Sequence, residues 1–430
     1  MLIGIDASRA NKDRKTGTEW YAYSLIREFA KIDSVNEYIL YTDTPLKGGL
    51  INLDNHSYDG NIEKITPEKP EFKNGYQILH SPHNNFKGKV LKWPFRYLWT
   101  QGRLSLEMIF GRPDVLFIPS HALPIIHPRN SVVTIHDIAF EKTDNVYENS
   151  TIGALKIGFK SRLLNFAAVI ATLGKYRAST LDYLRWSTEY ALKKAGKIIT
   201  ISENSKHDLI EVYKADDKKI KVIYNGYNHE NFRKIDDKEK IEAVLAKYDI
   251  KMPYFLYVGR IEKKKNIPTL IEAFGIMKNE YKQGNCSLVL VGAAGYGFDE
   301  VNFLIRQYDL TRSVKMPGWM VEADLPYIYA GATAFIFPSV YEGFGIPLVQ
   351  AMACGVPIAA SNSSCIPEIV NNNALLFDPR SPRAIVEAMK EIKYNQELRS
   401  NLIEKGLERA KDFSYEKCAS ETLAELTKLL

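Results

Sequence analysis

Short runs of apolar residues recur along the chain, with polar or helix-period segments between them. Each run is five or six residues long, the length and composition expected of buried strands in a parallel sheet. In the first half the runs are 2–6, 37–42, 115–120, 132–137, 197–202 and 221–225. In the second half they are 254–259, 287–292, 314–318, 334–339 and 356–361.

Segments with helical periodicity alternate with these runs. They include 266–280, 301–310, 345–353 and 382–393. Alternating strands and helices predict an α/β fold with parallel sheets. The last stretch, 413–430, predicts a helix with Ser414 as its N-cap.

A polar, charged segment at 228–240 separates the two series of strands. Each half of the chain has about the size of one Rossmann-like domain. The length of 430 residues agrees with this division, since domains typically span roughly 100–200 residues. We therefore predict two domains that divide near residue 228, with 228–240 as the linker.

Composition narrows the classes of protein to consider. The four cysteines form no CxxC pair, which argues against a zinc site and a disulfide framework and favours a reducing compartment. The first apolar run is too short for a signal peptide, and no stretch reaches 18 apolar residues. The net charge of +6 is mild, and we expect no nucleic-acid partner. The expected location is the cytoplasm.

Positive charge gathers in two stretches of the first half. Residues 86–103 and 151–180 each carry five basic residues and no acid, interleaved with aromatic side chains. For the segment 145–180 two interpretations stay open. It is either a helical insertion packed on the first domain or a membrane-surface segment, because each basic residue near anionic lipid contributes on the order of 1 kcal/mol. In the second case 86–103 belongs to the same face, and the protein is peripheral at the inner face of the cell membrane.

The stretch 342–368, EGFGIPLVQAMACGVPIAASNSSCIPE, carries the most specific chemistry. Glu342 follows a strand, Gly343, Phe344 and Gly345 form a turn, and a helix is predicted from about Ile346. A helix N-terminus exposes N–H groups and suits a pyrophosphate. A strand–glycine–helix junction also occurs in any α/β fold, so the turn alone does not decide.

A second motif, GRIEKKKN, begins at Gly259. Arg260 and Lys265 lie at the mouth of a strand–helix turn, where two cations can neutralise the charge on a diphosphate leaving group. The alternative is a solvated basic turn, which is the interpretation we favour for Lys263 and Lys264.

These stretches resemble the signature of retaining glycosyltransferases of family 4 (group 1), and the resemblance covers nearly the whole chain. It implies the GT-B fold, in which two Rossmann-like domains with parallel sheets face each other across a cleft that holds the active site. It also implies that the last helix returns to the first domain. The predicted domains are then 1–228 with about 414–430, on the acceptor side, and 229–413, which binds the nucleotide-sugar.

The resemblance also assigns roles to residues in the second half. It implies that Glu342 lies near the donor sugar together with the turn Gly343, Phe344 and Gly345. Arg260 and Lys265, after Gly259, match the elements that hold the donor phosphates. Gln350 stands where the family has a second acid on the donor ribose, and an amide can still hydrogen-bond a diol. The segment containing Trp319 and Met320 corresponds to the nucleobase pocket, although Trp319 also fits a core aromatic.

In the first half, His136 falls on the family's HD element, which lies close to the donor sugar and the acceptor. Gly17 fits the first turn of the family and is predicted to bind the donor. Glu19 and Trp20 stand where the family has a second Gly and an Arg. The predicted catalytic residues are His136, Glu342, Arg260 and Lys265.

The expected reaction is transfer of a hexose, with the mannose type favoured, from a GDP- or UDP-sugar to a glycan or lipid-linked acceptor in cell-surface polysaccharide synthesis. The chain has no DxD, P-loop, GxGxxG dinucleotide motif or metal-type histidine spacing, so we predict no metal and no cofactor. Two alternatives stay open. One is a nucleotide-sugar epimerase of the same fold. The other is a catalytically silent partner subunit, which Gln350 and the altered turn at Gly17 favour.

Overall fold

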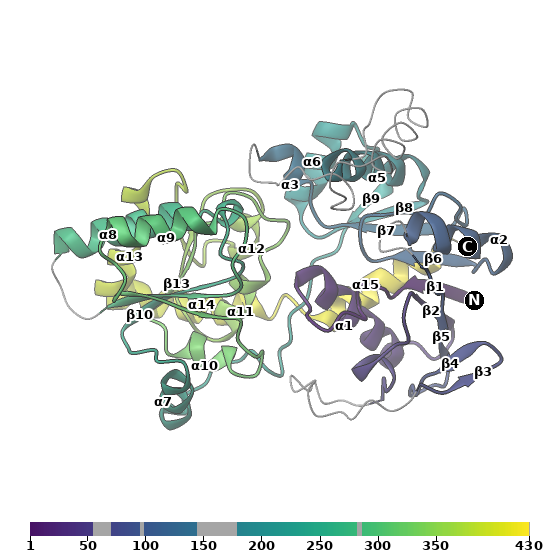
Figure 1. The fold of residues 1–430 in the computed structure, drawn as a ribbon, viewed down its shortest axis with the longest axis horizontal. Coiled ribbons are helices and arrows are strands. Elements are labelled where there is room, and N and C mark those ends of the chain that lie inside the picture. The colour runs from purple at the N-terminus through teal and green to yellow at the C-terminus, as the bar shows by residue number, and fades with distance from the viewer. Residues whose placement is uncertain (55–69, 95–98, 144–178, 282–285, 430) are drawn as a thin grey trace. The chain divides into compact units, whose positions relative to one another are not determined.

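The computed structural model describes residues 1–54, 70–94, 99–143, 179–281 and 286–429, which form two compact units (Figure 1). Unit 1 comprises Met1–Glu141, Glu148–Asn225 and Tyr415–Leu430, and unit 2 comprises Lys142–Tyr147 and Gly226–Ser414. Each unit is built around its own sheet. The chain divides after Asn225 and Ser414, near the boundaries predicted at 228 and about 414.

The sheet of unit 1 has the strand order β3-β4-β5-β2-β1-β6-β7-β8-β9. Its strands are β1 (Leu2–Asp6), β2 (Glu37–Thr42), β3 (Phe72–Lys73), β4 (Tyr76–Ile78), β5 (Phe86–Val90), β6 (Val115–Ile118), β7 (Ser131–Ile135), β8 (Lys197–Thr200) and β9 (Ile220–Val222). Each apolar run predicted in the first half forms a strand parallel to its neighbours. The hydrophobic pattern therefore located the centre of this sheet correctly.

One edge of the sheet was not predicted. β5 pairs in parallel with β2, whereas β3 and β4 form an antiparallel edge, so the sheet is not wholly parallel as expected. The sequence of β5 is FKGKV, in which lysines and a glycine interrupt the apolar pattern. Phe86 is nevertheless buried, so part of the basic stretch 86–103 belongs to the sheet.

Helices cover the faces of this sheet. They are α1 (Gly17–Ile32), α2 (Ser105–Phe110), α3 (Ala139–Lys142), α5 (Thr180–Lys194), α6 (Glu203–Tyr213) and α15 (Tyr415–Thr427), with short helical turns η1 (Gly48–Leu50), η3 (Thr100–Leu104) and η4 (Asp217–Lys219). The predicted terminal helix is α15, which begins directly after Ser414 and lies beside α1 (Figure 1). Two distant parts of the chain thus bury their apolar sides together.

The sheet of unit 2 is parallel throughout, in the order β12-β11-β10-β13-β14-β15. Its strands are β10 (Tyr254–Val258), β11 (Ser287–Val291), β12 (Val314–Gly318), β13 (Ala334–Phe337), β14 (Ile358–Ser361) and β15 (Leu375–Phe377). Five of these strands were predicted, and β15 was not. β13 and β14 are buried at every position, which explains their uninterrupted apolar sequences.

The helices of unit 2 are α7 (Lys238–Lys247), α8 (Ile267–Tyr281), α9 (Phe298–Gln307), α10 (Leu325–Ala330), α11 (Ile346–Ala353), α12 (Ile366–Val370), α13 (Pro382–Tyr394) and α14 (Gln396–Ala410), with the turn η5 (Lys263–Lys265). The predicted linker 228–240 is too long at its end, because Asp237 caps α7 and the helix begins at Lys238. α14 was not predicted.

Among the described residues, no helix combines the length and the apolar character needed to cross a bilayer. The predicted segment 145–180 and the basic stretch 151–180 lie outside the described residues, except for their last two residues, Ser179 and Thr180.

Candidate active site

The predicted donor-side residues gather at the carboxyl ends of the strands of the unit 2 sheet. This side of a sheet is called its edge below. β10 and β13 are parallel neighbours, so their carboxyl ends lie side by side. Lys265 follows β10 and Glu342 follows β13. The Lys265 Nζ lies 2.6 Å and 2.7 Å from the two carboxylate oxygens of Glu342. Sheet order therefore brings together two charges that are far apart in the sequence.

Glu342 is held in place through its backbone as well. The residue is only 8% exposed. Its N–H donates to Ser364 Oγ at 3.0 Å, and the Cys365 thiol donates to its carbonyl at 3.2 Å. The carboxylate is therefore fixed in position and compensated by one ammonium group.

Asn266, next to Lys265, joins the two turns, and it was not singled out from the sequence. Its Nδ2 donates to the carbonyl oxygens of Pro338, at 3.1 Å, and Pro379, at 2.7 Å. Its backbone has φ 58°, a left-handed conformation that Asn tolerates better than most residues. Asn266 is the last residue of the GRIEKKKN motif, and this position could have identified it from the sequence.

The turn Gly343, Phe344 and Gly345 leads directly into α11. Gly345 is the N-cap residue with φ 91°, and Pro347 occupies the first turn of the helix. Phe344 is buried, and its ring packs edge-to-face on Phe413 with centroids 5.5 Å apart. The turn is thus anchored by a core contact, and the first N–H groups of α11 form a site suited to an anion.

Glycines also connect the turns after β10, β11 and β12. The Gly259 N–H donates to the Val291 carbonyl, and the Gly292 N–H donates to the Gly318 carbonyl, both at 2.9 Å. A Cβ on Gly292 would lie 1.9 Å from the Gly259 oxygen, so this close approach requires glycine. Gly292 was missed as a site residue, although its position at the end of the run 287–292 was a signal.

Trp319 and Met320 follow β12 at this same edge. Trp319 is 55% exposed and Met320 is 3% exposed. The alternative that Trp319 is a core aromatic is wrong. Its exposed ring offers a surface on which a planar base can stack.

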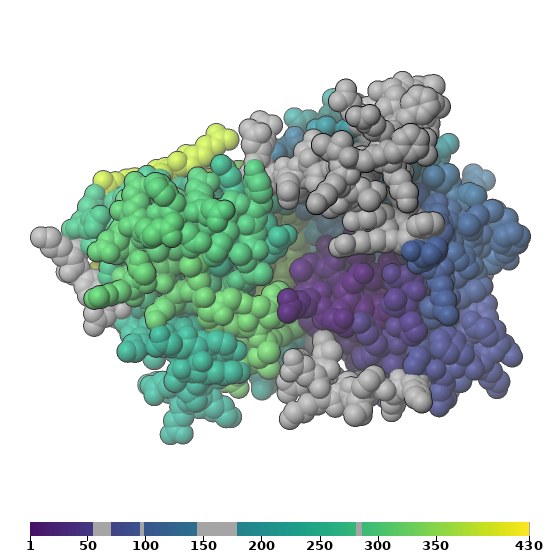
Figure 2. Space-filling view, in the orientation of Figure 1, coloured from purple at the N-terminus to yellow at the C-terminus, as the bar shows by residue number. Residues whose placement is uncertain are grey.

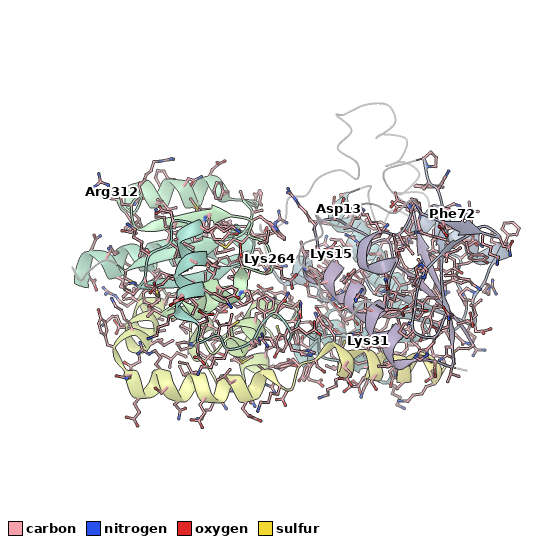
Figure 3. The ribbon with its side chains drawn as sticks, turned by 90° about the horizontal axis from the view of Figure 1, so that it is seen from below. Asp13, Lys15, Lys31, Phe72, Lys264 and Arg312 are labelled. Atoms are coloured by element: carbon pink, nitrogen blue, oxygen red, sulfur yellow. The ribbon has the colours of Figure 1, made fainter. Side chains whose placement is uncertain are left out.

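Arg260 is the outermost of the predicted cations. Its side chain is 62% exposed, and its Nε lies 3.5 Å from Glu262. In the same turn, the Lys263 Nζ lies 3.5 Å from Glu300 Oε2. Figure 3 labels the next residue, Lys264. The structure joins Lys265 to Glu342 but leaves the guanidinium of Arg260 largely in solvent.

Gln350 lies on α11, one turn beyond its N-terminus. Its Oε1 is 3.4 Å from the hydroxyl of Tyr329, a long hydrogen bond. The side chain is half-buried, so an amide at this place can meet a hydroxyl group of a ligand.

In unit 1, His136 directly follows β7 and is 8% exposed. Its ring packs edge-to-face on Tyr21 at 4.8 Å, and its Nε2 donates to the Pro119 carbonyl at 2.9 Å. A carbonyl can only accept, so Nε2 carries the proton and Nδ1 carries the lone pair. Burial lowers the pKa of His136 to about 4, and the ring is therefore neutral at pH 7.

Gly17 is the first residue of α1, and it is exposed. Part of the N-terminal stretch of unit 1, in purple, is visible on the surface in Figure 2. Glu19, which stands where the family has a second glycine, has a local role in this chain. Thr16 and Glu19 form a capping box, in which the Thr16 N–H donates to Glu19 Oε2 at 3.1 Å. The Arg9 Nη1 also lies 3.4 Å from Glu19 Oε1, so the Glu19 carboxylate forms an ion pair.

In the described ranges, the one group of potential metal ligands is His207, Asp208 and Glu211 on α6. His207 and Glu211 are exposed, and Asp208 accepts a hydrogen bond from Asn204 at 3.0 Å. None of these residues was predicted to bind a ligand.

Known proteins match nearly the whole chain. The model of Glycosyltransferase Family 4 matches residues 16–231, and the model of Glycosyl transferases group 1 matches residues 237–409. O-antigen chain mannosyltransferase B of Escherichia coli is 29% identical over 325 residues, which are 75% of this chain and 82% of that protein.

Two solved structures are similar over almost their full length. Sucrose-phosphate synthase from Thermosynechococcus elongatus has a TM-score of 0.68 at 18% identity, covering 100% of this chain and 99% of that one. Anabaena HepE in complex with UDP-glucose has a TM-score of 0.66 at 16% identity, covering 98% of this chain and 99% of that one. The fold is therefore of the GT-B type, as predicted.

Proposed function

The chain belongs to Glycosyltransferase Family 4, and on that premise we propose that it transfers a hexose of the mannose type from a nucleotide-diphospho-sugar to a glycan or lipid-linked acceptor in cell-surface polysaccharide synthesis. The observation that carries this proposal is the juxtaposition of Lys265 and Glu342 beside the N-terminus of α11. A cation, a carboxylate and exposed N–H groups at one sheet edge suit a sugar joined to a diphosphate.

Each group has a part in the proposed reaction. An ammonium has three donors, and Glu342 accepts two of those of Lys265, so the third is available to a phosphate oxygen. Arg260 and the N-terminus of α11 add positive potential for the leaving diphosphate, in place of a metal. As the sugar–phosphate bond breaks, an acceptor hydroxyl attacks the same face and its proton passes to the leaving diphosphate. The product then retains the anomeric configuration of the donor.

The choice of donor draws on the relatives. O-antigen chain mannosyltransferase B is a mannosyltransferase by name, and HepE binds UDP-glucose. We therefore propose mannose as the sugar, with GDP and UDP as the nucleotides to compare. Trp319 would stack on the base and Gln350 would hold the ribose hydroxyls.

Thermal stabilisation by donors tests this proposal. GDP-, UDP-, dTDP- and ADP-sugars would be compared on the wild type and on Arg260→Ala, in EDTA. A ligand at about 100 times its dissociation constant adds roughly 2.7 kcal/mol to the native state. We expect stabilisation by one nucleotide class, which weakens in Arg260→Ala, and transfer from that donor onto a tagged mannoside with retention.

Three results would count against parts of the proposal. An inverted product excludes retention. If donor binding is lost in EDTA and returns when Mg²⁺ is added, the protein depends on a metal. A folded wild type that no donor stabilises favours the silent-subunit alternative, with Gln350 as the lesion.

We also propose that unit 1 contacts an anionic membrane, through α2 rather than through 86–103 alone. In that stretch Phe86 is buried, and Lys89 and Arg103 both pair with Glu107. The apolar side chains that reach solvent lie just beyond it, on α2. Their exposed fractions are 49% for Leu106, 50% for Ile109 and 88% for Phe110.

Positive charge lies beside these side chains. Arg112 Nε donates to the carbonyl of Met108 on α2 at 3.3 Å, and Lys89 and Arg103 contact Glu107 of the same helix. Exposed apolar groups flanked by cations match the interface of anionic lipid.

Flotation with phosphatidylglycerol vesicles at low salt tests this contact. The wild type should float, and Phe110→Ser should remain largely unbound. Val35→Ser removes another exposed apolar group of unit 1, 83% exposed, and should float like the wild type. An unbound wild type, or equal flotation of all three proteins, would remove the idea.

A further inference from the structure

His121 has an unusual backbone conformation at the carboxyl end of β6. Its φ is 33°, in the left-handed region that residues other than glycine rarely adopt. Its N–H donates to the Thr134 carbonyl at 2.9 Å, and the Ala122 N–H donates to the Ser120 carbonyl at 2.7 Å. The surrounding backbone therefore holds this residue in a strained state, which is a frequent property of ligand-contacting positions.

The imidazole ring of His121 lacks one hydrogen bond. Its Nε2 is buried and has no partner in the part of the chain that the structure describes. Burial lowers the pKa of the ring, which is therefore neutral at pH 7, and a backbone hydrogen bond with Asp137 opposes this shift. Since Nε2 has no partner among the described residues, we assign this bond to the other ring nitrogen, Nδ1; because the bond raises the pKa, the ring is its donor, and in the neutral ring Nε2 then carries the lone pair. A buried acceptor without a donor destabilises the ligand-free protein, so its presence needs a reason.

The neighbours of His121 define the chemistry of this edge. β1, β6 and β7 are adjacent and parallel, so Asp6, the last residue of β1, lies at the same end of the sheet as His121 and His136, which follow β6 and β7. Arg9 lowers the pKa of His121, and Asp137 raises it, so both charges are near the ring. The side chain of Arg9 is 56% exposed, which shows that solvent reaches this edge.

This set of groups selects the kind of ligand. Two neutral imidazoles offer lone pairs, which attract O–H donors and do not attract phosphate or carboxylate oxygens. The residues of this edge do not form a metal-ligand group, since the group found in the described ranges lies on α6. A sugar hydroxyl is a donor of the kind that such a nitrogen accepts.

We propose that His121 Nε2 accepts a hydrogen bond from one hydroxyl of the acceptor sugar and so helps to determine which acceptor is used. The inference rests on the proposed function, and it assigns His121 to acceptor recognition and not to the chemical step. The neutral state of both rings keeps the two acceptor nitrogens available at physiological pH.

The test is a double-mutant cycle between His121 and the sugar. The donor is the one selected by thermal stabilisation, and the acceptors are a tagged α-mannoside and its 2-, 3-, 4- and 6-deoxy derivatives. His121→Leu removes the acceptor nitrogen, and His121→Gln restores an acceptor oxygen. His83→Leu is the matched control, because His83 is an exposed histidine of the same unit.

We expect His121→Leu to raise the KM for the mannoside about tenfold, as for one lost hydrogen bond to a buried acceptor, and to leave the KM for the donor unchanged. One deoxy derivative should be about tenfold poorer with the wild type and equal to the parent mannoside with His121→Leu. His121→Gln should recover part of the difference, and His83→Leu should behave as the wild type. The melting temperature of each ligand-free variant is measured alongside, because His121→Leu also loses the hydrogen bond with Asp137 and places leucine at φ 33°.

Other results overturn the proposal. If His121→Leu has an acceptor KM within twofold of the wild-type value, His121 does not bind an acceptor hydroxyl. The same follows if no deoxy derivative shows coupling with this substitution. A lowered melting temperature with an unchanged acceptor KM assigns it a structural role alone. If the wild type itself transfers no sugar from any donor, the proposed function fails, and this inference fails with it.

Discussion

The carboxyl ends of the strands differ in electrostatic character between the two sheets. At the edge of unit 2, Lys265 and Glu342 form an ion pair with side chains 19% and 11% exposed, and Arg260 reaches into solvent. At the edge of unit 1, His121 and His136 are kept neutral by burial. The same arrangement of parallel strands therefore carries a buried ion pair in unit 2, where we propose that phosphates bind, and uncharged imidazoles in unit 1, where we propose that hydroxyl groups bind.

The two edges also differ in how complete they are without a ligand. In unit 2 the carboxylate and the ammonium satisfy each other, and Asn266 connects the turns that carry them. In unit 1 the Nε2 of His121 has no partner within the described residues. The edge of unit 2 is thus organised without a ligand, whereas the edge of unit 1 retains an unmet hydrogen bond, which in our proposal a sugar hydroxyl completes.

Breaking the ion pair of unit 2 should have the largest effect. Lys265→Ala leaves the Glu342 carboxylate buried without its cation, which should destabilise the protein by about 3–5 kcal/mol. It should also lower kcat/KM at least about 100-fold, since a donor to the leaving group is lost. Urea unfolding and transfer rates measure the two effects.

Two matched variants sharpen this result. Lys263→Ala removes a cation of the same turn whose pair with Glu300 is about half exposed, and it should change stability by less than about 1 kcal/mol. Adding Glu342→Ala to Lys265→Ala should recover stability but not activity. Equal losses in Lys263→Ala and Lys265→Ala would show that the buried pair has no special role.

The neutral state of His136 should make the stability of unit 1 depend on pH. Its pKa of about 4 lies below the ordinary value near 6.5, so the unfolded chain binds the proton more readily and stability falls as the pH drops through this window. Between pH 7 and pH 5 the wild type should lose about 2 kcal/mol more than His136→Asn. The measurement is urea unfolding of both proteins at the two pH values, and parallel pH profiles would contradict the neutral, buried ring.

The turn before α11 should show the smallest effect. Gly345→Ala places a side chain at φ 91°, with its Cβ 2.9 Å from Leu348, and should cost about 1–2 kcal/mol while weakening donor binding. Gly406→Ala is the control, because Gly406 lies inside α14 and its added Cβ would meet its nearest neighbour at 3.5 Å. Alanine should be neutral or stabilising there. A donor affinity unchanged in Gly345→Ala would remove the turn from the proposed phosphate site.

Local patterns predicted much of the fold. Strands such as β13 and β14 are buried on both faces, so their uninterrupted apolar sequences were sufficient to locate them. The helix after Ser414 was also expected from its local sequence, and α15 begins directly after that residue. β5 was missed because its lysines and glycine hide the apolar pattern, although Phe86 is buried.

The residues of the candidate site also fall into those that local patterns indicated and those that they did not. Glu342, Arg260 and Lys265 were found from the sequence because each lies in a motif with a recognisable strand–turn–helix setting. Gly292 and Asn266 were missed because their importance comes from contacts with other turns, namely the Gly259 carbonyl and the carbonyls of Pro338 and Pro379.

The sequence by itself determined the α/β class, most strands, the family and the charged residues of the donor edge, because these depend on short-range periodicity and on contiguous motifs. Only the tertiary structure decided that Lys265 meets Glu342, and that His121 carries a buried nitrogen without a partner among the described residues. Strand order and burial control these features. Both arise from contacts between residues far apart in the chain, which no local pattern records.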